Sequence, residues 1–225
     1  MEGRRGDEVS AGALGAPPPA EFTQTRSAVD RFQAGDERAF EEIWRRYTPA
    51  IELLVATRVR PKLEPDLKAR IEASDVLQKV ALETHADLRH FTYRRPGSVL
   101  AWLTTILLHV VSDRIDYWRA QVRNPVRERE PSGSSSSRAA PLAHLRHPGR
   151  GPATEAGTAE LRRLVAAALV ELGERHQTIV IWKFFGGATW QEIAETVGSE
   201  SADAVRMEFS GKILPLLARL IPRPE

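Results

Sequence analysis

Arginine and aromatic residues are concentrated between residues 89 and 123. Six arginines lie in this segment against two acidic residues, Asp113 and Asp116, which leaves a local surplus of four positive charges. Arginine binds phosphate groups, and aromatic rings stack on unpaired nucleobases, so this composition indicates contact with a nucleic-acid strand. The candidate side chains for that contact are Arg94, Arg95, Arg114, Tyr117, Trp118, Arg119 and Arg123.

A second group of residues has the spacing of helix caps around a tight turn. Thr189 and Glu192 are spaced as a capping box, Gly198 permits a sharp turn, and Ser201 can cap the helix that follows. A short helix, a glycine turn and a longer helix are typical of a helix-turn-helix, whose second helix enters the DNA major groove. A plain helical hairpin within a bundle has the same pattern, so the pattern alone leaves both interpretations open.

The sequence offers little material for catalysis or metal binding. Cysteine is absent, which excludes disulfides, thiolate catalysis and cysteine-based metal sites. His144 and His147 lie in a proline- and glycine-rich segment with no third ligand nearby. No glycine-rich phosphate loop follows a strand, and no Ser/His/Asp order suggests a hydrolase. We therefore expect a protein that is not an enzyme and has no cofactor and no metal site.

Composition places the chain among soluble globular proteins with an ordinary core. Of 225 residues, 42% are hydrophobic and 28% charged, and the net charge of +2 means that any nucleic-acid contact depends on where the charge lies. The longest apolar stretch, Val99 to Val111, is shorter than the ~20 residues that span a bilayer. The first residues have no apolar core for a signal peptide. We expect a cytoplasmic protein without a membrane role.

Proline, glycine and serine divide the chain into four parts. Residues 1–25 are predicted to be a disordered tail, and residues 124–157 a flexible linker. Between and after them lie two bodies, 26–123 and 158–225. In both, apolar residues recur every three or four positions, which predicts an all-α fold of two small helical domains.

Local signals set the expected limits of the helices. The first runs from Phe40 to Val59, with Asp36 as its N-cap, a bend or break at Pro49 and an end near Pro61.

Further helices are expected in both bodies. One begins at Ser74, which caps it, and another follows Gly97 with Trp102 in the core. In the second body, Pro215 is expected to kink or end the helix that carries Val205 and Phe209 as core residues.

Short motifs in both bodies resemble extracytoplasmic-function (ECF) sigma factors of bacterial RNA polymerase, in particular the variety common in planctomycete-like bacteria. The matching stretches are GDERAFEEIW at 35–44, ASDVLQ at 73–78, AWL at 101–103, ATWQEIA at 188–194 and SADAVRM at 201–207. Their order and spacing, more than any single motif, make the resemblance specific. It implies a region-two helical domain in residues 26–123 and a region-four helix-turn-helix domain in residues 158–225.

The resemblance implies a factor that binds core RNA polymerase, recognises the minus-ten and minus-thirty-five promoter elements and helps to melt the DNA. It allows an anti-sigma factor as a further partner. Polymerase binding would fall to Asp75, Val76, Leu77, Gln78 and Lys79. His109 would join the basic and aromatic set at the minus-ten element. The helix-turn-helix would contact DNA through Thr189, Gln191, Ser201, Asp203, Arg206, Glu208 and Lys212.

The chain departs from the family at several of these positions. The family usually has Glu at position 79, Asn at 109 and basic residues at 116, 208 and 211, where this chain has Lys79, His109, Asp116, Glu208 and Gly211. The resemblance places Glu208 outward, facing DNA. If its carboxylate only repels the duplex, Glu208→Arg is expected to strengthen promoter binding; if it reads a cytosine amino group, the same change is expected to weaken binding and relax specificity at one position.

Two other functions are compatible with the sequence. One is a degenerate sigma-like module that binds polymerase or a regulator without directing initiation. The other is a free-standing helix-turn-helix regulator, which would bind its operator without polymerase.

Overall fold

The computed structural model describes residues 19–123 and 164–221, and every regular element in those ranges is a helix. The predicted all-α class is confirmed. The helices are α1 (Pro19–Gln33), α2 (Arg38–Leu54), α3 (Pro65–Arg70), α4 (Ala73–Asp87), α5 (Ser98–Arg123), a helical segment at 164–170, α7 (Glu174–Val180), α8 (Trp190–Val197), α9 (Ala202–Glu208) and α10 (Leu214–Leu220). The predicted linker lies outside the described residues.

Helix α1 begins within the segment predicted to be a tail. It starts at Pro19, and Thr25 is fully buried. The hydroxyl of Thr25 accepts a hydrogen bond from the guanidinium of Arg46 on α2 at 2.8 Å, and Val29 and Phe32 pack into the core. These contacts with α2 stabilise the helix, so the ordered body begins before residue 26.

Helix α2 contacts α1, α4 and α5 in the first body and is more continuous than predicted. Pro49 lies inside the helix without splitting it. The chain then passes through a π-turn (Val55–Val59) into a 3-10 turn (Arg60–Lys62), so the predicted end near Pro61 is confirmed. The carboxylate of Asp36 accepts the backbone N–H of Arg38 at 3.1 Å.

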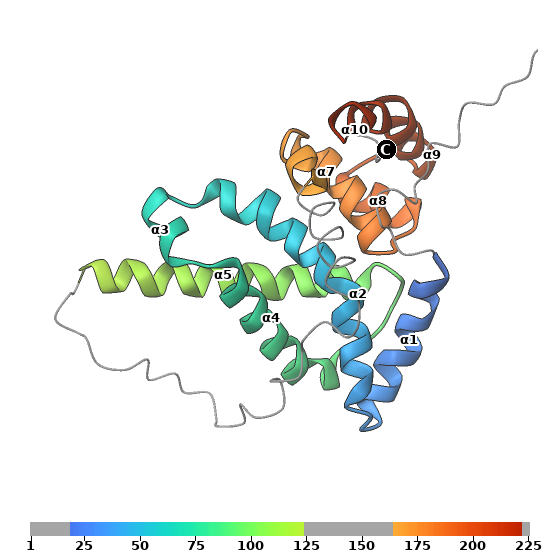
Figure 1. Ribbon diagram of the computed structural model, residues 1–225. Helices are drawn as coiled ribbons and strands as arrows, with labels where there is room; N and C mark the ends of the chain where they lie inside the picture. The colour runs from blue at the N-terminus through green and yellow to red at the C-terminus, as the bar shows by residue number, and fades with distance from the viewer. Residues whose placement is uncertain (1–18, 124–163, 222–225) are drawn as a thin grey trace, which may run out of the picture.

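Helices α4 and α5 pack against each other and against α2 (Figure 1). The predicted cap at Ser74 is wrong, because its hydroxyl lies 3.4 Å from the Glu72 carboxylate and α4 begins at Ala73. Residues Ser98–Val122 of α5 are long and apolar enough, by length and composition, to cross a membrane, contrary to the sequence estimate. Its leucines 100, 103 and 107 are nevertheless buried, which makes α5 a core helix of this fold.

The second body contains the two capped helices and the glycine turn that were predicted around Gly198. The Thr189–Glu192 capping box is present, Gly198 ends α8 with a left-handed φ of 64°, and the Ser201 hydroxyl accepts the N–H of Ala204 at 3.1 Å. The expected break at Pro215 takes another form. A π-turn (Phe209–Ile213) leads from α9 directly into α10, and the proline lies in the first turn of α10, so the helical backbone continues past it.

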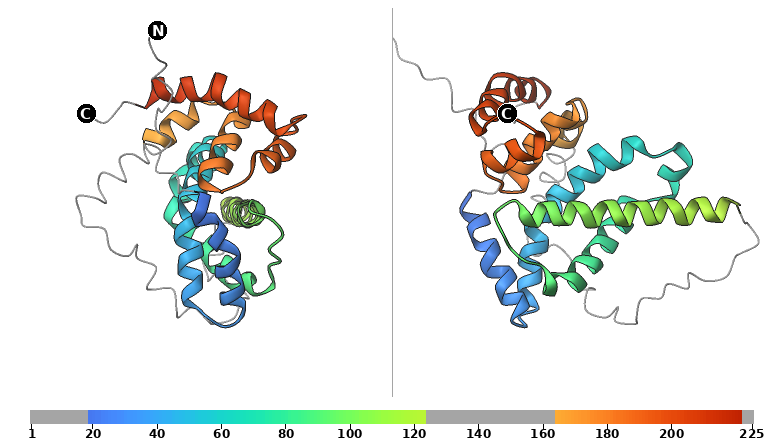
Figure 2. Two further views of the ribbon diagram at one scale, coloured as in Figure 1. Left: turned by 90° about the vertical axis from the view of Figure 1, so that its right-hand side faces the viewer. Right: turned by 180° about the vertical axis from the view of Figure 1, so that it is seen from behind.

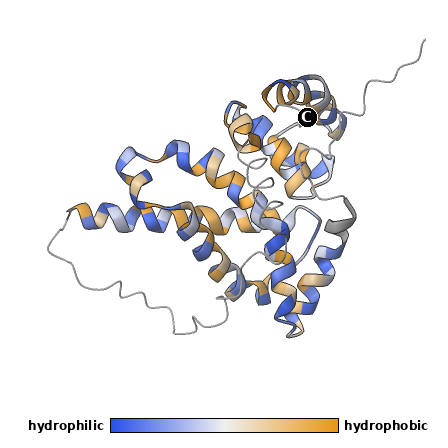
Figure 3. Cartoon of the chain, viewed as in Figure 1, coloured by the Kyte–Doolittle hydropathy of each residue, from blue (hydrophilic) through white to orange (hydrophobic). Residues whose placement is uncertain are grey.

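The two bodies lie against each other. Helices α7 to α10 sit over the amino-terminal end of α5 and the middle of α2, as three views agree (Figures 1 and 2). A π-turn (Ile181–Phe185) that follows α7 contacts α2, and buried residues of both bodies form one apolar cluster. Apolar residues gather on the helix faces that meet inside this arrangement (Figure 3).

Candidate nucleic-acid interface between the two bodies

A cavity of about 620 Å³ lies where the loop before α5 meets the second body. Loop 91–97 joins the 3-10 turn Leu88–His90 to α5 and supplies much of the lining. The ring of Phe91 lies 4.6 Å from that of Trp102, centroid to centroid, and both line the cavity. Basic side chains of His90, Arg94 and Arg95 line it as well. Aromatic surface next to cationic groups suits a planar, anionic ligand such as an unpaired nucleotide.

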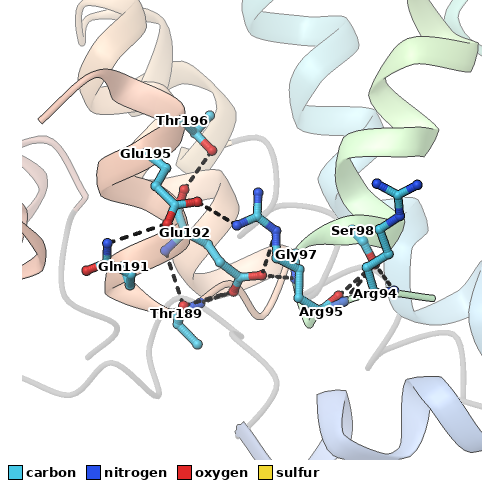
Figure 4. Close-up of polar contacts among 9 residues, drawn as sticks. All are labelled: Arg94, Arg95, Gly97, Ser98, Thr189, Gln191, Glu192, Glu195 and Thr196. Carbon is cyan, nitrogen blue, oxygen red and sulfur yellow. Dashed lines mark hydrogen bonds and ion pairs between the residues drawn. The ribbon is translucent and has the colours of Figure 1, made fainter. Parts of the chain in front are cut away.

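The second body supplies two further lining residues, Trp182 and Glu192. The Glu192 carboxylate is buried and serves two elements at once. One oxygen accepts the backbone N–H and the hydroxyl of Thr189, at 2.8 and 2.9 Å, as in a capping box. The other accepts the backbone N–H of Gly97 at 3.0 Å (Figure 4). The cap of α8 is therefore also a hydrogen bond between the two bodies.

Arg95 extends this contact. Its guanidinium donates to Glu195 at 2.5 Å and lies 3.6 Å from an oxygen of Glu192. The hydrogen bond from Arg95 lowers the pKa of Glu195, and the hydrogen bond to Glu195 raises the pKa of Arg95. Arg94 forms no ion pair with any described residue, and its guanidinium points away from the α8 carboxylates (Figure 4).

A second set of contacts joins the bodies on the α2 side. Arg58 donates to the backbone carbonyl of Glu174 at 2.8 Å and also bonds the Thr178 hydroxyl. Lys62 pairs with the Glu174 carboxylate at 2.6 Å, and this hydrogen bond lowers the pKa of Glu174.

Two glycines allow the backbones to approach closely. A Cβ placed at Gly186 would lie 2.3 Å from a methyl carbon of Leu100. A Cβ at Gly97 would lie 3.4 Å from that of Ala188. The junction is closely packed at both points.

The eight residues predicted for the minus-ten contact do not form one cluster. Arg94 and Arg95 lie at the cavity, whereas Arg119 lies 21 residues beyond the start of α5, about 30 Å along the helix axis. The exposed residue His109 lies between the two groups. The side chain of Arg123 lies outside the described residues.

The distal group of α5 has partners of its own. Arg114 lies 3.7 Å from Asp75, and Arg119 lies 3.4 Å from Glu64. Trp118 is half-buried, and the guanidinium of Arg70 lies 5.1 Å from the centre of its ring.

Tyr117 is the more accessible aromatic of this group, at 40% exposure. Its hydroxyl accepts a hydrogen bond from Gln121 at 2.8 Å, and its ring meets that of Trp118 edge-on at 5.3 Å. A nucleic-acid strand that ran along α5 would therefore meet Tyr117 before Trp118.

The expectation that Glu208 points outward is wrong. Its side chain is only 17% exposed and accepts three hydrogen bonds from Arg175 at 3.0 to 3.2 Å and one contact from His176 at 3.1 Å. The Arg175 hydrogen bonds lower the pKa of Glu208. These contacts link α9 to α7, so the carboxylate does not lie on the outer face of α9, where it would repel a DNA duplex.

The other residues predicted for the helix-turn-helix contact fall into two groups. Thr189 and Ser201 are used as helix caps. Arg206 pairs with Asp203 at 3.1 Å, with both side chains largely exposed. Also exposed are Gln191, whose amide lies 3.4 Å from Glu195, and Lys212.

The residues predicted to bind polymerase lie along the start of α4. Val76 is a core residue, and Leu77 is partly buried against the core. Asp75, Gln78 and Lys79 are exposed, and Lys79 pairs with Glu83 at 3.3 Å. The expectation that Val76 contacts a partner is therefore wrong, because its side chain is 1% exposed, whereas Asp75, Gln78 and Lys79 form an accessible polar strip beside the partly buried Leu77.

Sequence reasoning missed His90, Phe91, Trp182, Glu192 and Glu195 as residues of the junction. The capping-box signal identified Glu192 as a cap but not as a bond to residue 97. No local pattern indicates contacts between positions about 100 residues apart.

No protein-family model and no curated protein matches the chain. Within residues 19–123 and 164–221, no three acidic or histidine side chains are grouped so that they could hold a metal ion. His144 and His147 lie outside those ranges.

Proposed function

We propose that this chain is a promoter-specificity subunit of bacterial RNA polymerase, of the ECF sigma type that its motifs resemble. The observation that carries the proposal is the helix-turn-helix α8–Gly198–α9 packed beside a basic, aromatic cavity on a separate helical body. One module suits duplex DNA and the other suits a single strand. A protein that both recognises and opens a promoter needs both.

Each part then has a role. The exposed strip of Asp75, Gln78 and Lys79 would contact polymerase, with Leu77 as its apolar base. The cavity at loop 91–97 would receive an unpaired base of the melted minus-ten element. Helix α9 would enter the major groove of the minus-thirty-five element.

The charge distribution favours this function over a free-standing regulator. Arg206 is already paired with Asp203, and Glu208 neutralises Arg175, so the helix-turn-helix has little free positive charge apart from Lys212. Phosphate contacts supply most of the affinity of proteins that bind DNA alone. A weakly charged module suits a protein that polymerase holds on the promoter.

A second candidate is a polymerase-binding module that does not direct initiation. The observation that favours it is that Arg95, Arg114 and Arg119 all have carboxylate partners, which leaves less charge for a DNA strand.

Transcription by core polymerase with and without the protein distinguishes these candidates. We expect the protein to direct initiation at a discrete set of start sites, mapped by sequencing of transcript ends. Polymerase binding without new start sites would favour the module. Tight binding of specific duplexes without polymerase would favour the regulator.

A further inference from the structure

The side-chain amide of Gln33, the last residue of α1, connects that helix to the start of loop 91–97. Its Nε2 group donates to the backbone carbonyl of Leu88 at 3.1 Å and to that of Phe91 at 2.6 Å. A side-chain amide has two N–H protons, and here each has a carbonyl acceptor. One side chain therefore bonds the first residue of the 3-10 turn Leu88–His90 and the residue that follows the turn.

Other contacts hold the same turn against the corner between α1 and α2. Arg89 pairs with Glu37, and its guanidinium lies 5.3 Å from the centre of the Phe32 ring. The Nε2 atom of His85 lies 2.8 Å from the Glu37 carboxylate. Phe32 is fully buried, so the next residue, Gln33, extends from a fixed point of the core. A shift of the turn relative to α1 would therefore break several polar contacts at once.

The far end of the loop is fixed by Ser98, the first residue of α5. Its hydroxyl donates to the carbonyl of Arg95 at 2.7 Å and accepts the backbone N–H groups of Arg94 and Arg95, each at 3.4 Å (Figure 4). With both ends held, the loop keeps the Phe91 ring 4.6 Å from that of Trp102 at the cavity. A stacking surface that is ordered in advance need not be ordered when a ligand binds, so the ligand binds more tightly.

We propose that Gln33 is a positioning residue for the nucleic-acid strand and acts through the ring of Phe91. Gln33 does not line the cavity, so its effect on a ligand passes through the loop whose first residue it holds. This rests on the proposed function, because it takes the ligand of the cavity to be an unpaired strand. It goes beyond that function by giving α1 a part in strand binding, although α1 lies outside the basic and aromatic segment 89–123.

Gln33→Glu tests the two donors, because it keeps the size of the side chain and, at neutral pH, leaves a carboxylate that cannot donate to either carbonyl. Gln24→Glu is the matched control. It makes the same change of charge on the same helix, at an exposed residue whose side chain bonds no other described residue. The full chain is titrated into a fluorescein-labelled single-stranded DNA of mixed sequence and followed by anisotropy. We expect Gln33→Glu to bind about five- to tenfold more weakly than Gln24→Glu.

A double-mutant cycle with Phe91→Ala distinguishes positioning from a general loss of structure. Phe91→Ala alone removes the stacking ring and should weaken binding about fivefold or more. In the Phe91→Ala background, Gln33→Glu has no ring left to displace and should weaken binding by less than about twofold. A purely structural role would give the same fold-change in both backgrounds. Thermal unfolding followed by circular dichroism gives the temperature range in which all variants are folded, and binding is compared there.

The outcomes separate the positioning role from the proposed function. Equal binding by Gln33→Glu and Gln24→Glu, or equal fold-changes with and without the Phe91 ring, overturns the positioning role and leaves the proposed function standing. Should Gln33→Glu fail to fold, Gln33→Leu against Gln24→Leu, which adds no charge, decides by the same criteria. Absence of strand binding by the wild type, or wild-type binding by Phe91→Ala, overturns the ligand assigned to the cavity and the positioning role with it. Failure of the wild type to direct initiation with core polymerase overturns the proposed function itself.

Discussion

Replacement of Glu208 gives a clear test of the helix-turn-helix geometry. Its carboxylate accepts three hydrogen bonds from Arg175 and contacts His176, and its side chain is 17% exposed. Charge-assisted hydrogen bonds contribute about 1.5–3 kcal/mol. Since the Arg175 side chain is 41% exposed and partly screened by solvent, the lower end applies. Glu208→Ala should then reduce the free energy of unfolding by about 1.5 kcal/mol and lower Tm by about 3–6 °C.

Glu208→Arg should reduce the free energy of unfolding by more than Glu208→Ala does, by about 2–3 kcal/mol in total, because it places a second guanidinium beside Arg175. Its loosened α9 should bind promoter DNA more weakly, which is the opposite of the result expected for a carboxylate that only repels the duplex. Arg206→Gln is the control for stability. It breaks an ion pair whose side chains are 62% and 82% exposed and should change stability by less than about 0.5 kcal/mol. Calorimetry and salt titrations of DNA binding measure both effects. An unchanged or higher Tm for Glu208→Arg, with tighter and more salt-sensitive DNA binding, would refute this geometry.

Three further predictions follow from local geometry. Gly186→Ala places a Cβ 2.3 Å from a methyl carbon of the buried Leu100 and should reduce the free energy of unfolding by about 1–3 kcal/mol in chemical denaturation. Gly211→Ala adds a Cβ with no atom within 4 Å and should raise it by up to about 1 kcal/mol in the same assay. Ser201→Ala removes a helix cap and should lower the free energy of unfolding by about 1 kcal/mol in the same assay. The pKa values of Glu195 and Glu174 are lowered in the folded protein, so their ion pairs stabilise it above the ordinary value of 4.5 and are lost as the pH falls below it. The difference in free energy of unfolding between the wild type and a variant with Glu174→Gln and Glu195→Gln should therefore disappear in an acid titration.

The parts of the fold that depend on local chemistry could be predicted from the sequence. The capping box at Thr189, the left-handed Gly198 and the cap at Ser201 follow from side chains that bond backbone groups within three residues. Ser74 shows the limit of such reasoning. A neighbouring acidic side chain, that of Glu72, competes for its hydroxyl, and α4 begins without a side-chain cap.

The candidate site could be predicted only in part, because its main contacts are distant in sequence. The basic and aromatic composition near Arg95 indicated a strand-binding region, but not that Glu195 would occupy that arginine. The resemblance placed Glu208 outward because it assigns positions on a helix without the neighbouring helix. Only the packing of α9 on α7 brings Arg175 within hydrogen-bond distance.

The near-neutral net charge gains a physical meaning from these pairs. With a net charge of +2, the chain has little long-range attraction for DNA, and the arginines of α5 and its preceding loop are mostly neutralised by carboxylates of the same chain. Arg95 differs from Arg114 and Arg119 because its partner belongs to the other body, so its pairing depends on the contact between the two bodies. The charge at the cavity therefore depends on how the two bodies pack, whereas the arginines near the distal end of α5 are paired within their own body.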